Sequence, residues 1–458
     1  MQVTLVSLRP PDAASARPAL TPELLAAVGA RYSRNNEGLE AILGRMDASD
    51  QDASVDRIFQ FVDYGHASIA DMAPVAMFLD GVSLWLAWWI WSQCPVAGGQ
   101  ESSTRYIRMD RDALVDPQDL GVSEADRGPW LARMDAAFSA YQQALAYWEG
   151  VAKDDPARIR IPDGTPRKAA ERMRRNFAFD RARVFLPAAC STNVMLVMSA
   201  RAWVGLCQNL LSHPLPEAVA CGHAIREELA AATPRLIRHA RRLDSQVAGH
   251  DRERSTAKAL ASHPNPFLDH SEGPSDHPST AFLDIAMPPD VDAQTMRADL
   301  ELHDNRYAYF GEGLRRTAVR FGWDAVALAE IRDLNRHRTG TKYCPQCPIG
   351  FYGAFDEAPV ANSAVLAEHI QVGRMATATA RRRLLADDPG FVYDLLLGSQ
   401  FRFEHTTTGD KFLYEAELRT GTGAHYRYAR HLRDTLALWY ERFPETRGMV
   451  LEGSAEPE

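Results

Sequence analysis

Apolar residues recur at helical spacing along most of the chain, whereas strand-like runs are few and short. One helix start is clear at Thr21-Pro22-Glu23, where a hydroxyl can cap the helix and proline and an acid fill its first turn. This helix is expected to continue toward Leu43. The same spacing predicts further helices over residues 55–65, 124–152, 169–179, 217–242, 324–338, 363–386 and 423–443.

The most apolar stretch, residues 73–91, contains Asp80 and changes character near Gly81. A charged residue in its middle makes it a poor membrane span, so it predicts a buried strand followed by a helix. Trp85, Trp88 and Trp89 share one face of that helix, which favours a core or subunit-interface role over a platform for stacking a base.

Composition shifts over residues 248–280, which are polar and rich in Pro, Ser, Asp and His. The histidines are irregularly spaced, so a solvated linker is a better interpretation than a metal-binding tract, and no metal site is expected. The pattern therefore predicts a first domain over residues 1–247, a linker over 248–280 and a second domain over 281–458. The predicted fold class is α+β, with two tandem helix-rich domains that each carry a small antiparallel sheet.

The net charge is −9, which does not favour nonspecific binding to nucleic acid. Six cysteines, mostly isolated among apolar residues, fit a reducing compartment better than a disulfide scaffold. The first 20 residues have no basic start or long apolar run typical of a signal peptide. The expected location is cytoplasmic, without membrane contact.

Two short motifs far apart in the chain carry the most suggestive polar chemistry. "QESSTRY" places Glu101, Ser103 and Arg105 at alternate positions, so an extended loop points all three the same way. "NRHR" places the triplet 336–338 at the end of a predicted helix, spread over a wide arc. Guanidinium and hydroxyl groups suit a phosphate. Each motif alone also fits an ordinary polar loop or cations at a helix C-terminus.

A third motif, "GHASIAD", holds His66, Ser68 and Asp71. A helix that starts here can present backbone N–H groups to an anion. The alternative is that Ser68 merely caps the helix and His66 is an ordinary exposed histidine.

Together the first two motifs resemble the signature of the flavin-dependent thymidylate synthases. That signature is Arg-His-Arg, then Ser three residues on, and Ser-x-Arg at eight to ten residues on. The first part of the chain keeps the pattern from Glu101 to Arg105 but reads Gln-Cys-Pro at 93–95. The second part keeps Arg-His-Arg at 336–338, replaces the first Ser by Thr341, and reads Gln and Pro at 346 and 348. Each part has kept what the other has lost.

Other segments extend the resemblance. "GHASIAD" is similar to the family's His-x-Thr-x-x-Glu flavin segment, and "ARVFLP" to its substrate-binding Ala-Arg-x-x-Leu-Pro through Arg183. "MSARAW" resembles the family's Asn-x-Arg, with Ser199 for Asn and Arg201 kept. Leu210 stands where the family has a further substrate arginine, and Arg419 falls on that position in the second part.

The resemblance implies an enzyme that transfers a one-carbon unit from methylenetetrahydrofolate to C5 of dUMP, with FAD reduced by NADPH. Family members are homotetramers with sites between subunits, so a tandem copy implies a homodimer that imitates the tetramer. One composite site per chain would combine the motifs that each part has kept. The implied roles are catalysis by Arg336; substrate binding by Glu101, Ser103, Arg105, Arg183 and Arg419; and flavin binding by His66, Ser68, Asp71, Arg201, Arg336, His337 and Arg338.

Two alternatives remain open. The lost Gln before Arg-His-Arg (Asp333 in the second part, Ile90 in the first), Ser199 and Leu210 all permit another pyrimidine nucleotide, in specialised biosynthesis. The chain can also be a non-catalytic flavin- or nucleotide-binding homologue. Intact Arg-His-Arg argues against this second alternative.

The cysteines do not change this picture. Cys94 is read as a buried free thiol and not a nucleophile. The pair in "CPQC", Cys344 and Cys347, is half a zinc motif without a second half, so a proline-stiffened loop without metal is the preferred interpretation.

Overall fold

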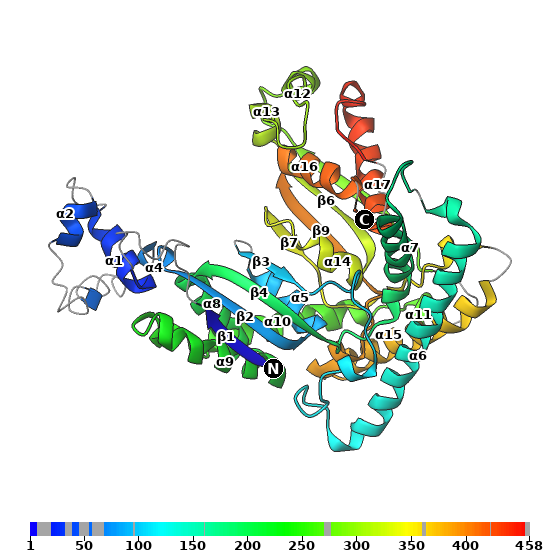
Figure 1. The fold of residues 1–458 in the computed structure, drawn as a ribbon, viewed down its shortest axis with the longest axis horizontal. Coiled ribbons are helices and arrows are strands. Elements are labelled where there is room, and N and C mark those ends of the chain that lie inside the picture. Colours follow the sequence, from blue (N-terminus) through cyan, green and yellow to red (C-terminus); the bar gives the residue numbers. More distant parts are fainter. Residues whose placement is uncertain are drawn as a thin grey trace. The chain divides into compact units, whose positions relative to one another are not determined.

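The structure is a computed structural model that describes residues 1–6, 20–32, 39–44, 55–56, 68–94, 97–159, 161–269, 276–359, 363–421 and 423–453. The described chain divides into two compact units (Figure 1). The first unit comprises residues 1–102, 115–121 and 191–252, and the second comprises residues 103–114, 122–190 and 253–458. Each unit contains one antiparallel sheet with helices around it.

The sheet of the first unit has the strand order β1-β2-β4-β3. Its strands are β1 (Gln2–Val6), β2 (Pro74–Ser83), β3 (Gly98–Glu101) and β4 (Ser191–Ser199). The central strands alternate or run apolar and are buried on the core side, as expected for a half-covered antiparallel sheet. The helices of this unit are α1 (Pro22–Tyr32), α2 (Leu39–Gly44), α4 (Ser68–Asp71), α5 (Leu84–Gln93), α8 (Ala200–Leu211) and α9 (Pro216–Ala232), and α10 (Asp244–Ala261) begins here.

Serine caps fix where two helices leave this sheet. Ser83 ends β2, and its hydroxyl accepts a hydrogen bond from Leu86 N at the start of α5. Ser199 ends β4 and caps α8 in the same way through Ala202 N. The strand-then-helix pattern predicted for residues 73–91 is confirmed, and the tryptophans of α5 are buried.

The sheet of the second unit has the order β5-β6-β9-β7, with β8 also pairing with β9. Its strands are β5 (Ala281–Ala286), β6 (Ala318–Ala327), β7 (Thr341–Tyr343), β8 (Gly350–Phe351) and β9 (Ser399–Thr408). Helix α17 packs on β5, and α16 packs on α17. The helices of this unit include α6 (Glu124–Asp154), α7 (Arg167–Ala182), α11 (Pro266–Asp269), α12 (Ala293–Leu300), α13 (Glu312–Arg316), α14 (Leu328–Leu334), α15 (Ser363–Leu385), α16 (Gly409–Thr420) and α17 (Tyr426–Arg442).

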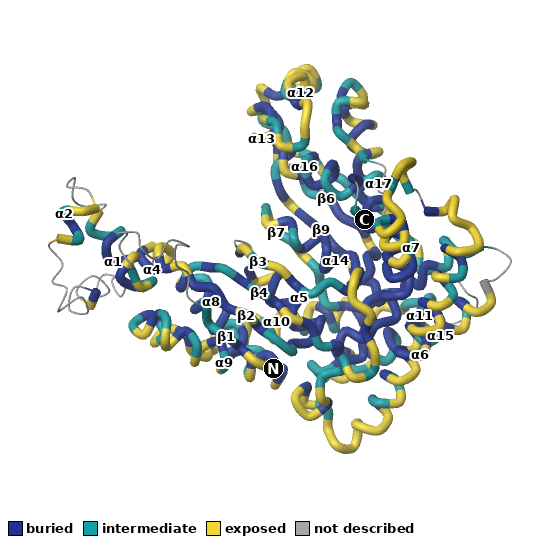
Figure 2. Tube along the Cα trace, in the orientation of Figure 1, coloured by how far each residue is buried: buried dark blue, intermediate teal, exposed yellow. Residues whose placement is uncertain are grey.

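Strand β9 and helix α14 belong to the core of the second unit, and their residues are mostly buried (dark blue in Figure 2). Every residue of α14 is buried, including charged Glu330, Arg332 and Asp333. Charged groups in such a place need partners, because a buried charge without one is costly. The end of α14 is therefore a place where ion pairs or ligands are required.

The two sheets share a topology. In each, the second strand is central, ends in a helix, and pairs with the last long strand, which also runs into a helix. The second strand carries a register shift in both sheets, between Asp80 and Val82 in β2 and between Trp323 and Val326 in β6. Helices α8 and α16 each have 12 residues. Leu210 and Arg419 are each the last residue but one of their helix, which supports the register in which Arg419 replaces Leu210.

The predicted α+β class, with two small antiparallel sheets, is confirmed. The helix expected from Thr21 toward Leu43 is described as α1 and α2, and residues 33–38 between them lie outside the described residues. One local prediction was wrong. The segment expected to be a solvated linker contains most of α10 and all of α11. These helices could not be recognised from their polar composition, because an exposed helix packs on the protein through only a narrow apolar face.

Candidate active site in the second unit

The second unit gathers four arginines from distant parts of the chain. Arg105 follows β3, Arg183 follows α7, Arg336 follows α14, and Arg419 lies in α16. Two buried aspartates, Asp180 and Asp333, link them, and we call these six residues the arginine cluster. All six belong to the second unit, so the motifs kept by the two parts of the sequence meet within one body.

Arg105 forms a two-point ion pair with Asp180. Its Nε lies 2.7 Å from Asp180 Oδ1, and its Nη2 lies 2.8 Å from Oδ2. Its Nη1 donates to the carbonyl of Gly423 at 2.8 Å. Burial raises the pKa of Asp180, but the charge and hydrogen bond of Arg105, together with His425 and Arg183, outweigh burial and hold the pKa below its usual range. Ser103 shapes this turn, since its hydroxyl accepts from Arg105 N.

Arg183 is almost fully buried, with 2% of its side chain exposed. Its Nη2 donates to Asp333 Oδ2 at 2.9 Å and to the carbonyl of Ala329 at 3.4 Å, and its Nη1 donates to Thr104 Oγ1 at 3.3 Å. Its Nε finds no hydrogen-bond partner among the described residues. The implied role of Arg183 at the base of a nucleotide stays a prediction; the contacts found here are with protein groups.

Asp333 lies among three guanidinium groups. Burial raises its pKa, but the nearby charges, that of Arg183 first and those of Arg336 and Arg105 after it, reverse this effect. They hold the pKa of Asp333 well below its usual range. Its Oδ1 lies 4.0 Å from Arg336 Nε, which is an ion-pair distance and too long for a hydrogen bond. Asp333 is therefore an ionised carboxylate at neutral pH.

His337 is buried and neutral. Burial is the largest cause that lowers its pKa, to about 3. The neutral ring accepts a hydrogen bond at Nε2 from Arg419 Nε, 2.6 Å away. Arg419 Nη2 also donates to the backbone carbonyl of Asp333 at 3.3 Å. In this structure His337 positions Arg419, and its implied contact with a flavin stays a prediction.

Arg336 and Arg338 are the more accessible cations of the triplet. The side chain of Arg336 is 33% exposed, and Arg338 is exposed. Partial burial and then the charge of Arg336 lower the pKa of Arg338, which is the expected result of two like charges held close together. An anion between them would relieve this repulsion.

The implied flavin segment and Glu101 belong to the first unit. Arg201 Nη1 lies 2.8 Å from Asp71 Oδ2, and Ser199 donates to Asp71 Oδ1 at 3.1 Å. Both charged side chains are about half exposed. Ser68 begins α4, and His66 lies outside the described residues. The sequence motif thus forms a local cluster in the first unit, while Arg105 and the Arg-His-Arg triplet meet in the second.

Sequence reasoning missed the carboxylates. Asp180 went unnoticed, and Asp333 was noted only as a replacement for Gln. One signal was available for Asp180, because it interrupts an arginine-rich run just before Arg183 and thus offered a partner for buried cations.

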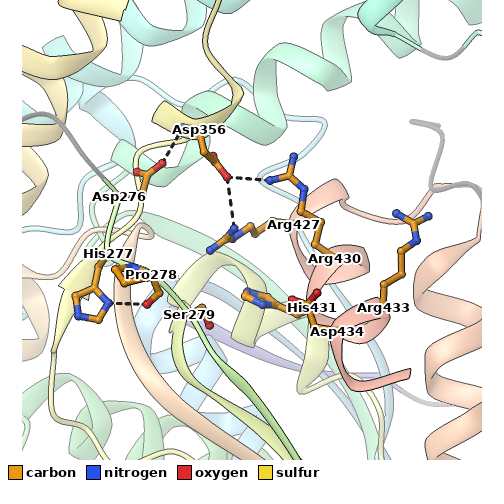
Figure 3. Close-up of a pocket in the computed structure, with 10 residues that line it drawn as sticks. All are labelled: Asp276, His277, Pro278, Ser279, Asp356, Arg427, Arg430, His431, Arg433 and Asp434. Carbon is orange, nitrogen blue, oxygen red and sulfur yellow. Dashed lines mark hydrogen bonds and ion pairs between the residues drawn. The ribbon is translucent and has the colours of Figure 1, made fainter. Parts of the chain in front are cut away.

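A separate pocket of about 350 Å³ lies between residues 276–279 and α17 (Figure 3). In this pocket the Asp356 carboxylate forms ion pairs with two arginines, at 2.8 Å from Arg430 and 3.6 Å from Arg427. Burial raises the pKa of Asp276, whose Oδ2 accepts a hydrogen bond from Asp356 N at 3.1 Å, to about 7. None of the predicted site residues lines this pocket. Arg427 and Arg430 already pair with Asp356, so we keep the arginine cluster as the candidate active site.

The cysteines are poor nucleophiles. Burial raises the pKa of Cys94 and of Cys344 to about 12, so both are thiols at neutral pH. Cys347 accepts a weak hydrogen bond from Arg381. In the part of the chain that the structure describes, no group of three or more His, Cys, Asp or Glu side chains is placed to hold a metal ion. Over the same residues, no helix has the length and apolar character needed to cross a membrane.

Residues 19–235 match the family model described as thymidylate synthase complementing protein. The resemblance read from the motifs is confirmed. A UPF0159 protein of Chlamydia pneumoniae is 24% identical over 372 residues, covering 69% of this chain and 68% of that protein. A flavin-dependent thymidylate synthase of Mycobacterium sp. (strain KMS) is 28% identical over 142 residues, covering 31% of this chain and 52% of that protein. The chain thus spans about half the length of this second relative.

Among solved structures, a UMP/dUMP methylase from Streptomyces cacaoi bound with 5-Br dUMP is 15% identical, with a TM-score of 0.33. The match covers 52% of this chain and 93% of that chain.

Proposed function

We propose that the arginine cluster binds a pyrimidine nucleotide and that the protein transfers a one-carbon unit to C5 of its base. The observation that carries this proposal is the meeting of Arg105 with the Arg-His-Arg triplet and Arg419 in one unit, although more than 200 residues separate them in sequence. The family match and the name of the mycobacterial relative, a flavin-dependent thymidylate synthase, support the reaction class.

The charge of the cluster supports an anionic ligand. The cluster holds four arginines and two carboxylates, and the neutral ring of His337, which contacts Arg419, adds no charge. The excess of positive charge suits a phosphate, which arginine recognises through paired hydrogen bonds. In the proposed complex Arg105, Ser103 and Arg419 hold the nucleotide phosphate, Arg183 lies behind the base, and Arg336 polarises the base as the catalytic residue.

FAD is the proposed cofactor, with NADPH and methylenetetrahydrofolate as co-substrates. When bound, the flavin would supply the hydride for the transfer. The exposed guanidinium groups of Arg336 and Arg338 fit a diphosphate by charge, whereas His337 is turned inward to Arg419. The groups proposed to meet the flavin in the first unit are His66, Ser68, Asp71 and Arg201. Arg201 and Asp71 fit this role by exposure, although each now pairs with the other.

The shared sheet topology supports a tandem origin of residues 1–247 and 281–458, although residues 103–114 and 122–190 pack into the second compact unit. We propose that the chain forms a homodimer with the symmetry of a four-domain assembly. Only one class of composite site would then keep all the binding arginines, because Leu210 and the Gln-Cys-Pro triplet at 93–95 carry no positive charge.

Purified protein tests the proposal directly. We expect bound or readily added FAD, visible as a flavin absorption spectrum, at one equivalent per chain. We also expect flavin-dependent release of the C5 hydrogen from a pyrimidine nucleotide. A protein that takes up no FAD and binds no pyrimidine nucleotide would contradict both catalysis and simple flavin binding. Two flavins per chain would instead contradict the single composite site.

A second candidate function is the same chemistry on another pyrimidine nucleotide. Asp333 favours this possibility, since an ionised carboxylate stands where the resemblance places Gln. Titration with dUMP, UMP and CMP separates the two candidates.

A further inference from the structure

The pocket between residues 276–279 and α17 is lined by an arginine, Arg427, whose hydrogen-bond donors are unused (Figure 3). Only 13% of its side chain is exposed. Asp356 Oδ2 lies 3.6 Å from its Nη1, which is an ion-pair distance and too long for a hydrogen bond. Its guanidinium carbon lies 4.2 Å from the centre of the Tyr352 ring. Among the described residues no acceptor takes a hydrogen bond from this guanidinium, although it carries five N–H donors.

Two further donors of the pocket have capacity to spare. The Oγ of Ser279 is buried and has no hydrogen-bond partner in the described part of the chain. Arg433 donates from Nη2 to the carbonyl of Gly453 at 2.9 Å, and no described carboxylate pairs with it. A donor removed from water without a partner is costly, so these groups indicate that a ligand supplies the missing acceptors.

The two inner carboxylates of the pocket are already occupied. Both oxygens of Asp276 accept backbone hydrogen bonds, from Gly353 N at 2.6 Å and from Asp356 N at 3.1 Å. The oxygens of Asp356 accept from the Tyr352 hydroxyl at 2.9 Å and from Arg430 Nη1 at 2.8 Å. The unused capacity therefore lies with the donors, which indicates an anionic ligand and argues against an amine.

The size and the charge of the pocket favour a phosphate group. Its volume of about 350 Å³ is near the lower end of the range for small-molecule sites, about 300–1,000 Å³, so a compact ligand fits better than a dinucleotide. Arg427, Arg430 and Arg433 follow one another at intervals of three residues and line the same pocket from α17. Phosphate oxygens take paired hydrogen bonds from guanidinium groups. The remaining acid, Asp434, is exposed, so solvent screens its charge.

We propose that this pocket is a second anion site, which binds a small phosphate-bearing ligand. Arg427 and Arg433 donate to the phosphate oxygens, and the Ser279 hydroxyl donates to one of them. The pocket shares no residue with the arginine cluster. The inference therefore does not depend on the proposed function, and neither one fails with the other.

Titrations of the full chain test whether the site exists. Inorganic phosphate and ribose 5-phosphate are the probes, and sodium chloride at the same ionic strength is the control. We expect saturable binding of both probes by calorimetry and a rise in melting temperature that sodium chloride does not give. Tighter binding of ribose 5-phosphate identifies the ligand as a phosphate monoester, and equal binding identifies it as free phosphate. If neither probe binds, the inference is overturned.

Variants of the pocket assign the binding to it. Ser279→Ala should weaken phosphate binding at least about tenfold, as expected for the loss of a hydrogen bond to a charged group. The melting temperature of the ligand-free variant should not fall, because the hydroxyl has no partner to lose. Arg427→Gln should weaken binding further. Arg442→Gln is the matched control, since Arg442 is exposed on the same helix outside the pocket, and it should bind phosphate as the wild type does.

Arg336→Ala separates this pocket from the arginine cluster, which also attracts anions. Phosphate binding that is lost in Arg336→Ala but unchanged in Ser279→Ala and Arg427→Gln would place the anion in the cluster alone and overturn the inference. If Arg427→Gln does not fold, Ser279→Ala still decides the question, because it removes a single unpaired hydroxyl. Binding of pyrimidine nucleotides to the cluster is measured independently, so this outcome leaves the proposed function intact.

Discussion

Arg105 and Asp180 form a two-point ion pair inside the second unit, with 2.7 and 2.8 Å between their paired atoms and less than a tenth of either side chain exposed. This contact joins the motif that follows β3 to the end of α7. The arginine of "QESSTRY" therefore has a structural partner as well as a proposed ligand.

Removal of either partner of this ion pair is expected to be costly. Arg105→Ala leaves the Asp180 carboxylate buried and unpaired, so we expect a loss of about 3–5 kcal/mol in unfolding free energy. The double variant Arg105→Gln with Asp180→Asn removes both charges and should recover part of that loss. Thermal unfolding measures both effects.

Arg167→Ala is the control, since Arg167 pairs with Glu171 on the surface with 92% of its side chain exposed. It should change the melting temperature little. Equal effects of Arg105→Ala and Arg167→Ala would contradict the buried ion pair.

Arg336→Ala should separate binding from stability. Arg336 is partly exposed and contacts Asp333 only at 4.0 Å, so its loss should change the melting temperature little. Nucleotide affinity and turnover should each fall at least about tenfold, because a charge-assisted contact to the ligand is lost. Calorimetry and a C5-hydrogen release assay measure these changes. Arg297→Ala, in exposed α12, is the matched control, and a similar loss of affinity in it would count against the assignment.

Two buried histidines should make the protein less stable as the pH falls. Burial is the largest cause that lowers the pKa of these histidines. The pKa of His337 falls to about 3 and that of His425 to about 4. Between these values and the unfolded value near 6.5, the unfolded chain binds protons that the folded chain does not, so acidification favours unfolding. We expect the melting temperature to decline from pH 6.5 toward pH 4.

His425→Gln should flatten this decline, and the exposed His223→Gln should not. Asp276 acts in the opposite direction, because its pKa is raised to about 7 and its contribution to stability is lost as the pH rises through that value. The comparison of variants at each pH therefore isolates the histidine effect. A decline of the same slope in His425→Gln would show that other groups cause it.

Gly340 should not tolerate a side chain. Its φ is +66°, and a Cβ there would lie 2.0 Å from the carbonyl oxygen of Thr406 in β9. Gly340→Ala is therefore expected to destabilise the β7–β9 edge by more than about 1 kcal/mol. Gly249→Ala is the control, since nothing lies within 4 Å of its Cβ position in the middle of α10. This change should stabilise the helix slightly, by about 0.5–1 kcal/mol. A neutral Gly340→Ala would contradict the close approach of the two backbones.

The features that could be predicted from the sequence are those set by interactions between residues close together in the chain. The strand-to-helix change after Asp80 and the serine-capped starts of α5 and α8 follow from local patterns, because capping and periodicity act within a few residues. The helical character of residues 244–261 was missed, since weak amphipathic signals leave exposed helices undecided.

The sequence by itself determined that the chain is α+β, that it resembles the flavin-dependent thymidylate synthases, and which arginines each part has kept. These conclusions rest on residue types and their spacing, which are properties of the amino-acid sequence itself. Only the tertiary structure decided that Arg105, Arg183, Arg336 and Arg419 gather in one unit around Asp180 and Asp333. Contacts between residues more than 70 positions apart are set by how sheets and helices pack, and a buried charge reveals its partner only once that packing is known.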